Sequence, residues 1–463
     1  MTTQNAYLIG STRQVFIKTA LPIIFMMLVN GSFNLIDAYF LGVFVGAEAL
    51  AAVTATFPAT IFFVALSTLV ANGFASIMAR ALGAKDYTYA REAYAQALSL
   101  SLLVSAVLMA FFLHFGQTLA LAINQWQSEL ATLSHDYLLI MACATPVSFA
   151  LAVNGDSLRC EGNIRFMTTV SLATVCLNAV LNYVFIVQLN LGVAGSAYGT
   201  VCAQLIGLLA LANFRLRQRS ELNLPFIKLS SRVDFWGRFI SLGAPSSLRY
   251  IGLALSSGAI LYSLQALPPE QYGVTVSAYG IINRVMTFVF LPLLGLSLAF
   301  QSIVGNTYGA KQFDRANDAI KTALWGSLLY GFIIQGFILY LSASIGSWFV
   351  NAPEVITRVD DILPIWTAAL SLMGPLMIVG MLFQSIGDAK RAALMSIVKT
   401  YCFSIPLVFL LSHYLGVQTV WYSAPTAEVL ALLVALAVLY QRSNIDSFKY
   451  GLFFRTSQNH KTS

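Results

Sequence analysis

The residue of this sequence best placed to do chemistry is Asp37, a carboxylic acid inside a long apolar segment at residues 17–42. A carboxylate at the centre of a membrane helix costs about 3 kcal/mol, so it needs a partner or a function. Asn34 precedes it by three residues and would share its helical face. Pro22 lies upstream, where a proline bends a helix. Asp37 is therefore the first candidate for a functional ionisable group.

Neutral oxygen-bearing side chains occur at a comparable depth of two later apolar segments. Asn178 and Asn182 are four residues apart and would share one helical face, and Thr200 lies in the next segment. Together with Asp37 they supply one ionisable carboxylate and three neutral oxygens. Such a set suits a hard cation such as sodium, or a proton carried by Asp37. The alternative is that the neutral groups only form hydrogen bonds between helices.

Composition indicates which elements position these residues. Hydrophobic residues make up 58% of the 463 residues and charged residues only 10%, whereas soluble proteins contain about 25% charged residues. A membrane-spanning helix needs about 20 mainly apolar residues. We therefore expect an all-α integral membrane protein with twelve transmembrane helices. Their approximate spans are 17–42, 49–80, 90–115, 131–156, 164–188, 193–214, 237–266, 275–308, 316–342, 355–384, 390–413 and 418–440.

The basic residues test this topology independently. With the N-terminus inside, 23 of the 26 Lys and Arg residues fall in or near the inner loops, and only Arg249, Arg284 and Arg358 do not. This bias fits the positive-inside rule and predicts that both termini are cytoplasmic. Because the basic residues are spread over every inner loop, they do not predict a nucleic-acid-binding surface.

An internal repeat divides the chain into two halves. Residues 76–98 align without a gap with residues 302–324 at an offset of 226, and nine of the 23 positions are identical. Each copy joins the second helix of a six-helix half to the third, so both halves have the same orientation. We predict two six-helix pseudo-symmetric lobes around a central cavity. The predicted parts are an N-lobe at 1–214, a basic cytoplasmic linker at 215–236, a C-lobe at 237–440 and a cytoplasmic tail at 441–463.

The second half carries a different set of intramembrane charges. Its first helix has no acid at the depth of Asp37, but Arg249 and Arg284 lie in its first two helices and Glu428 in its last. A buried charge is most readily neutralised by pairing, so Glu428 is expected to pair with one of these arginines. The alternative is a direct role of the three residues in binding or gating.

The remaining polar residues add candidates for the cavity and little sign of catalysis. Asn34, Tyr137 and Asn154 are expected to line the cavity. Asp360 and Asp361 form an acidic pair, but magnesium sites of membrane prenyltransferases need a second acidic cluster. The sequence has no phosphate-binding loop and no hydrolase motif. We expect no catalytic residue, no cofactor, and no metal beyond a possible sodium ion at Asp37.

The order and spacing of several segments resemble the multidrug and toxic compound extrusion (MATE) transporters, particularly the DinF-like and MepA-like branch. The resemblance covers nearly the whole chain. It is carried by the first-helix stretch LPIIFMMLVNGSFNLIDAYF, two GAK loops, LRCEGN, LNAVLNYVFIVQLNLGVAGSAYGT, SAYGIINRVMTF and VWYSAPTAEVLA. It implies export of organic cations and other amphipathic compounds across the bacterial cytoplasmic (inner) membrane, in exchange for inward protons or sodium. It also implies that Asp37 is the coupling acid, with Asn178 and Thr200 as neutral partners.

One departure from the family pattern is Asn182, where many members carry an aspartate. Asp37 is then the only acid of the site, and a lower site charge weakens sodium binding. The sequence therefore favours proton coupling or a relaxed choice of ion.

The expected partners are small organic cationic or amphipathic substrates and membrane lipids, and the protein is expected to be a monomer. Two alternative functions remain open. A flippase for lipid-linked saccharides of the same superfamily would be favoured if Arg249 and Arg284 both faced the cavity unpaired. A membrane enzyme of the prenyltransferase type would require a second acidic cluster.

Overall fold

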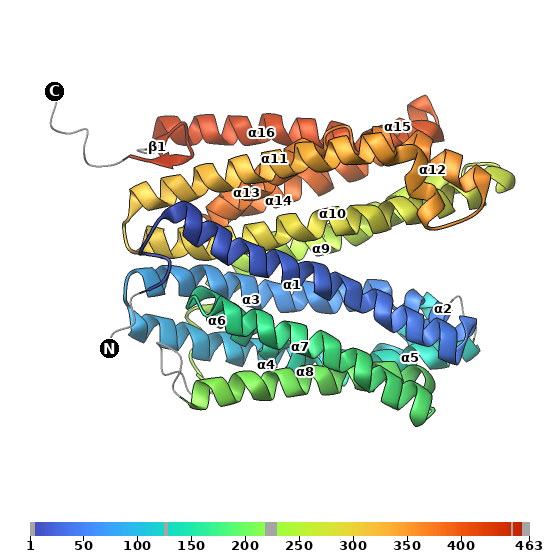
Figure 1. Cartoon of the computed structure of the whole chain (residues 1–463), viewed down its shortest axis with the longest axis horizontal. Helices are drawn as coiled ribbons and strands as arrows, with labels where there is room; N and C mark the ends of the chain where they lie inside the picture. The colour runs from blue at the N-terminus through green and yellow to red at the C-terminus, as the bar shows by residue number, and fades with distance from the viewer. Residues whose placement is uncertain (1–4, 125–127, 218–228, 446–447, 456–463) are drawn as a thin grey trace. The chain divides into compact units, whose positions relative to one another are not determined.

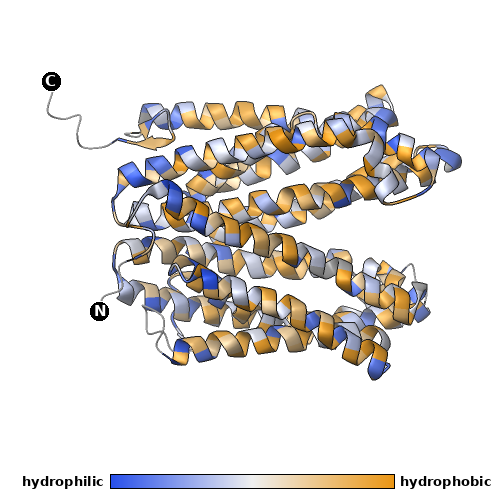
Figure 2. Cartoon of the chain, viewed as in Figure 1, coloured by the Kyte–Doolittle hydropathy of each residue, from blue (hydrophilic) through white to orange (hydrophobic). Residues whose placement is uncertain are grey.

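The computed structural model describes residues 5–124, 128–217, 229–445 and 448–455. Nearly all of these residues are helical (Figure 1), and the long helices carry apolar residues along most of their length (Figure 2). Figure 2 shows hydrophilic residues gathering near the helix ends. This pattern confirms the all-α membrane class.

The helices correspond to the twelve predicted spans. Within the described ranges, nine helices are long and apolar enough to cross a membrane, and two bent pairs raise the number to 11. The remaining span is α9 (Trp236–Leu264), which is 29 residues long and carries Arg249 near its middle. Each predicted span therefore has a helical counterpart.

The chain divides into two compact units. Unit 1 contains Met1–Ile9 and Phe25–Tyr250, and unit 2 contains Gly10–Ile24 and Ile251–Ser463. The first part of α1 thus belongs to unit 2 and the first part of α9 to unit 1. Of the predicted basic linker, residues 218–228 lie outside the described residues.

Unit 1 contains the elements of the first half. They are most of α1 (Thr12–Phe40), η1 (Leu41–Val45), α2 (Ala47–Ala55), α3 (Phe57–Gly83), α4 (Tyr87–Ile123), α5 (Ser128–Cys143), α6 (Thr145–Cys160), α7 (Ile164–Asn182), η2 (Tyr183–Gln188), α8 (Gly192–Leu216) and the first part of α9.

Unit 2 contains the elements of the second half. After the remainder of α9 they are α10 (Pro269–Gly309), α11 (Phe313–Ile345), η3 (Gly346–Trp348), α12 (Pro353–Trp366), α13 (Leu370–Ile386), α14 (Ala389–Ile397), η4 (Val398–Ser404), α15 (Ile405–Leu415), η5 (Val417–Tyr422), α16 (Ser423–Ile445), β1 (Phe448–Lys449) and β2 (Phe453–Phe454).

The backbone of the two halves shares features at the repeat offset. Lys85 and Lys311, the lysines of the two GAK loops, both adopt a positive φ, at 59° and 57°. Helices α5 and α6 meet at a bend of 48°, and their counterparts α12 and α13 meet at 49°. The internal repeat of the sequence is therefore also a repeat of local structure.

Part of the predicted tail, residues 448–454, forms a small hairpin. Strands β1 and β2 pair antiparallel, with Phe448 opposite Phe454. The side chain of Asn317 on α11 donates to the carbonyl oxygen of Phe454 and accepts from its backbone nitrogen, both at 2.8 Å. Arg442, at the end of α16, lies 3.6 Å from the ring centroid of Phe448. These contacts attach the hairpin to α11 and α16 within unit 2.

Candidate functional site

The carboxylate of Asp37 lies buried in unit 1, near the C-terminal end of α1. Only 8% of the residue is exposed. The side-chain amide of Asn182 donates a hydrogen bond to Asp37 Oδ1. A charged oxygen makes stronger hydrogen bonds than a neutral one, particularly where water is excluded. Asn182 therefore holds the carboxylate against the end of α7.

The other two predicted residues extend this contact into a chain. Asn182 Nδ2 also lies 3.3 Å from Asn178 Oδ1, and Asn178 Nδ2 donates to Thr200 Oγ1 at 3.2 Å. Asn178 and Asn182 are fully buried and Thr200 is 3% exposed. The structure thus brings together all four residues of the predicted ion site, from α1, α7 and α8.

Two buried oxygens beside this chain have no hydrogen-bond partner among the described residues. They are Asn182 Oδ1 and Ser196 Oγ. Ser196 lies one turn before Thr200 on α8 and so shares its helical face. Buried polar atoms without a partner are uncommon and call for an explanation. Oxygen atoms of this kind, next to a carboxylate, can coordinate a sodium ion. They can also accept a hydrogen bond from the carboxyl group when it is protonated.

Gly199 is a residue of the site that the sequence reasoning missed. A Cβ atom at Gly199 would clash with Asn182 Oδ1 and would lie 3.2 Å from Asn182 N. Only glycine therefore allows α8 to approach the end of α7 this closely. The small-residue pattern of the stretch GVAGSAYG signals close helix packing, and it could have identified this position.

Substitution of Gly199 should damage the site without adding or removing charge. We expect Gly199→Ala to displace the Asn182 amide and to lower transport by about tenfold, since a hydrogen bond to a charged group contributes about 1.5–3 kcal/mol. Transport in liposomes at equal protein content measures the effect. Gly155→Ala is the matched control, because its Cβ would meet no atom within 4 Å. Equal losses in both variants would contradict this role of Gly199.

A hydrophobic cluster lies beside the site. Its buried members include Leu41, Tyr137, Ile186 and Val193. The phenol of Tyr137 lies within electrostatic range of Asp37. Tyr137 thus adjoins the predicted ion site. The side chain of Asn34, which was expected to line a cavity, lies outside the described side chains.

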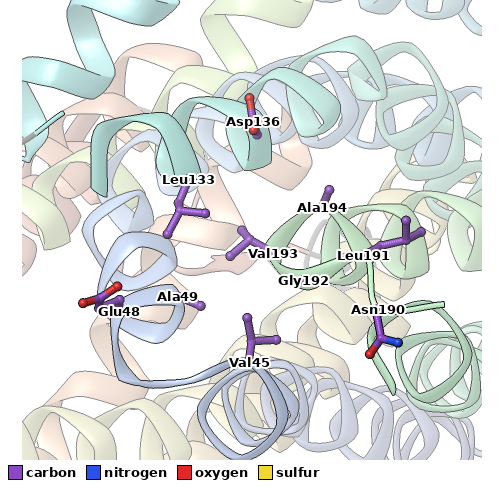
Figure 3. Close-up of a pocket in the computed structure, with 10 residues that line it drawn as sticks. All are labelled: Val45, Glu48, Ala49, Leu133, Asp136, Asn190, Leu191, Gly192, Val193 and Ala194. Atoms are coloured by element: carbon purple, nitrogen blue, oxygen red, sulfur yellow. The ribbon is translucent and has the colours of Figure 1, made fainter. Parts of the chain in front are cut away.

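A pocket of about 300 Å³ opens in unit 1, next to this cluster (Figure 3). Val193 and Ala49 belong both to its lining and to the hydrophobic cluster. Its polar lining comes from Glu48, Asp136 and Asn190. The two carboxylates give the pocket a negative potential that attracts cations.

Asn154 lies in a buried ion network rather than at a cavity. Its Oδ1 accepts from Tyr94 Oη at 2.7 Å and from Arg215 Nε at 3.0 Å. Arg215 Nη2 lies 3.2 Å from Glu161 Oε1, and both side chains are fully buried. Arg215 lies in the last turn of α8, although the predicted linker begins at this residue, and the network joins α4, α6 and α8.

The expected partner of Glu428 needs correction. Glu428 on α16 pairs with Lys399 of η4 rather than with an arginine. Lys399 makes this contact inside the eleventh helix, whereas the charge count grouped it with the basic residues of the inner regions. Arg249 is half-buried and Arg284 exposed, and neither has an acidic partner among the residues described here.

Comparisons with known proteins agree with this architecture. Residues 22–184 and 270–410, more than half of the chain, match the family model described as MatE. The chain is 24% identical over 425 residues to the probable multidrug resistance protein YoeA of Bacillus subtilis, covering 89% of this chain and 90% of that protein. It is 23% identical over 430 residues to the multidrug export protein MepA of Staphylococcus haemolyticus, covering 92% of each.

A solved structure shares the fold. It is an outward-facing conformation of a multidrug resistance MATE family transporter, with a TM-score of 0.86 and 23% identity over 96% of this chain and 98% of that one. The sequence relatives are named as export or resistance proteins, not as enzymes. The fold agrees with the resemblance of the motifs, and the family match extends over most of both halves: the chain belongs to the MatE family.

Proposed function

We propose that this protein is a secondary active transporter that exports organic cations and other amphipathic compounds in exchange for protons. The observation that carries the proposal is the buried Asp37 carboxylate, bound by Asn182 and connected through Asn178 to Thr200. The names of the relatives YoeA and MepA support the multidrug export. We place the protein in the bacterial cytoplasmic membrane as a monomer, with both termini in the cytoplasm.

The coupling step follows from the electrostatics of Asp37. A proton or cation that reaches Asp37 cancels a charge that is costly in an apolar environment. The bond from Asn182 is weaker to a neutral acid than to a carboxylate, so α1 and α7 are held together differently in the two states. If the protonated and the charged states of Asp37 favour different conformations, protonation changes the affinity for the exported compound. By linkage, binding of the exported compound changes the affinity of Asp37 for the proton to the same extent.

Proton coupling fits the donor set better than sodium coupling. Asn182 presents its N–H group to the carboxylate, and Asp37 is the only acid among the four hydrogen-bonded residues of the site. Sodium prefers several oxygen ligands, and its affinity rises with the negative charge of the site. A single carboxylate that already accepts an N–H donor is therefore better suited to a proton.

Asn182→Asp should move the transporter toward sodium. A second carboxylate beside Asp37 doubles the site charge, and we expect the sodium concentration for half-maximal transport to fall by about tenfold or more. Export under imposed sodium gradients of different size gives this concentration. Unchanged sodium dependence in Asn182→Asp would contradict the assignment of the ion site.

The proposed function is tested by reconstitution. Purified protein in liposomes should export ethidium, a fluorescent organic cation, under an imposed proton gradient. Collapsing the gradient with a proton carrier should stop the export. Export under a sodium gradient alone would identify sodium as the coupling ion and would still support antiport. The absence of export under either gradient would contradict the proposed function.

A second candidate is a flippase for lipid-linked saccharides. Arg249 and Arg284 have no acidic partner in the described part of the chain, and unpaired arginines suit pyrophosphate groups. Translocation of a pyrophosphate-linked lipid that is lost in Arg284→Gln would favour this function over cation export.

A further inference from the structure

A lysine–glutamate ion pair lies inside unit 2, between its fifth and sixth helices. Lys399 Nζ contacts Glu428 Oε1, and the lysine side chain is 34% exposed and the glutamate side chain 10%. Lys399 is ten residues from the start of α14 at Ala389, which places it about 15 Å from the inner helix end. Both charges therefore lie well inside a hydrocarbon layer of about 30 Å.

This pair does not have the properties of a good structural contact. Removing two charges from water costs more than their attraction returns unless the remaining lone pairs are satisfied. Glu428 Oε2 is buried and has no hydrogen-bond partner among the described residues. A carboxylate with an unused buried oxygen retains the capacity to bind a further cationic or N–H donor group.

Lys399 lies in a π-helical segment, and two other π-helical segments lie next to the Asp37 site. Three segments of the described chain are π-helical. Segment η1 begins four residues after Asp37, η2 begins directly after Asn182, and η4 contains Lys399. π-Helical turns are rare and frequently occur at functional sites. The only π-helical segment of unit 2 within the described residues thus carries an intramembrane charge.

Contacts on two sides hold η4 in place. A Cβ atom at Gly252 would lie only 2.6 Å from Thr400 Cγ2, so α9 packs tightly against η4 next to Lys399. One turn before Lys399, Met395 packs against an apolar cluster with Leu376 and Leu432. Apolar side chains therefore lie next to the pair, and the flexible thioether of Met395 can adapt to different apolar shapes.

The internal repeat relates this pair to the Asp37 site. At the offset of 226, Thr200 corresponds to Thr426, two residues before Glu428, and Asn178 corresponds to Ser404, the last residue of η4. The fifth and sixth helices supply neutral groups in unit 1. In unit 2 the same two helices supply an acid and a base.

We propose that Glu428 binds the positively charged nitrogen of an exported amphipathic cation, and that Lys399 is a resident ammonium that occupies the carboxylate when no such cation is bound. This inference rests on the proposed export function and assigns it a substrate-binding group in unit 2. The four-carbon stem of a lysine lets its ammonium move away while the stem stays on apolar surface. When the cation leaves, Lys399 returns, and the empty transporter does not carry an unpaired buried carboxylate.

Substitutions of Glu428 and of Lys399 should consequently change the Kd for ethidium in opposite directions. Glu428→Gln removes the anion, and we expect the Kd for ethidium to rise by about tenfold or more. Lys399→Met removes the competitor, so the Kd should fall by about tenfold while turnover slows, because the bound cation is no longer displaced. Lys390→Met and Glu270→Gln are matched controls at exposed positions of unit 2.

The experiment measures ethidium binding by fluorescence titration at one fixed pH, and ethidium export in liposomes. The double variant Lys399→Met/Glu428→Gln covers the case in which a single variant fails to fold, since it buries no unpaired charge. We expect it to fold and to bind ethidium as weakly as Glu428→Gln.

A purely structural pair gives a different result. Both single variants would then lose thermal stability and binding together, and the double variant would recover both, which would overturn the proposal. Wild-type binding in Glu428→Gln would also overturn it. These outcomes differ from a failure of the proposed function, in which the wild-type protein itself would not export ethidium.

Discussion

Asp37→Asn should abolish gradient-driven export while leaving the protein folded and inserted. Asparagine has nearly the size of aspartate, and its carbonyl oxygen can still accept the hydrogen bond from Asn182. The series of hydrogen bonds that connects residue 37 to Thr200 therefore keeps its geometry, and only the ionisable charge is lost. We expect ethidium export under a proton gradient to fall to the rate of liposomes without protein.

The matched control for this variant is Asp136→Asn. Asp136 is also an acid of unit 1, but it is exposed and lines the pocket shown in Figure 3. Its loss removes part of an attractive potential, which affects the encounter with cations more than the coupling itself. Export by Asp37→Asn at the wild-type rate, at equal protein content, would refute the coupling role.

Arg215→Ala should cause the largest loss of stability. Arg215 pairs with Glu161 at 3.2 Å, and both side chains have no exposed surface. Removing one partner of a buried ion pair leaves an uncompensated charge and costs about 3–5 kcal/mol. The substitution also removes a donor to Asn154. A thermal unfolding assay in detergent measures the effect.

Arg217→Ala provides the control for the same helix end. Arg217 follows α8 directly and is exposed, so its loss should change the free energy of unfolding by no more than about 0.5 kcal/mol. Equal melting temperatures for the two variants would contradict the stabilising role of the buried network.

The sequence predicted the helices and the four residues of the Asp37 chain for the same physical reason. Runs of about 20 apolar residues have few explanations other than membrane helices, so the polar residues within them stand out. Helical periodicity then placed Asn178 and Asn182 on one face. The structure adds that Lys85 and Lys311, in the two repeated GAK loops, share a positive φ.

The features that the sequence could not predict depend on how deep a side chain lies in the helix bundle and on how closely two helices approach. The charge count grouped Arg215 and Lys399 with the basic residues of the inner regions and treated them as topology signals, although both make contacts inside the bundle. The role of Gly199 depends on where Asn182 Oδ1 lies in space. The π-helical segments depend on packing against neighbouring helices, which a linear pattern does not contain.

The most direct test of the account measures ion movement driven by the substrate. Liposomes that contain the protein and a trapped pH-sensitive dye are given an ethidium gradient and no imposed proton gradient. We predict that ethidium flux through the wild-type protein drives protons in the opposite direction, and that Asp37→Asn shows no such proton movement. Ethidium flux without proton or sodium movement, or equal proton movement in Asp37→Asn, would contradict the assignment of Asp37 as the coupling group.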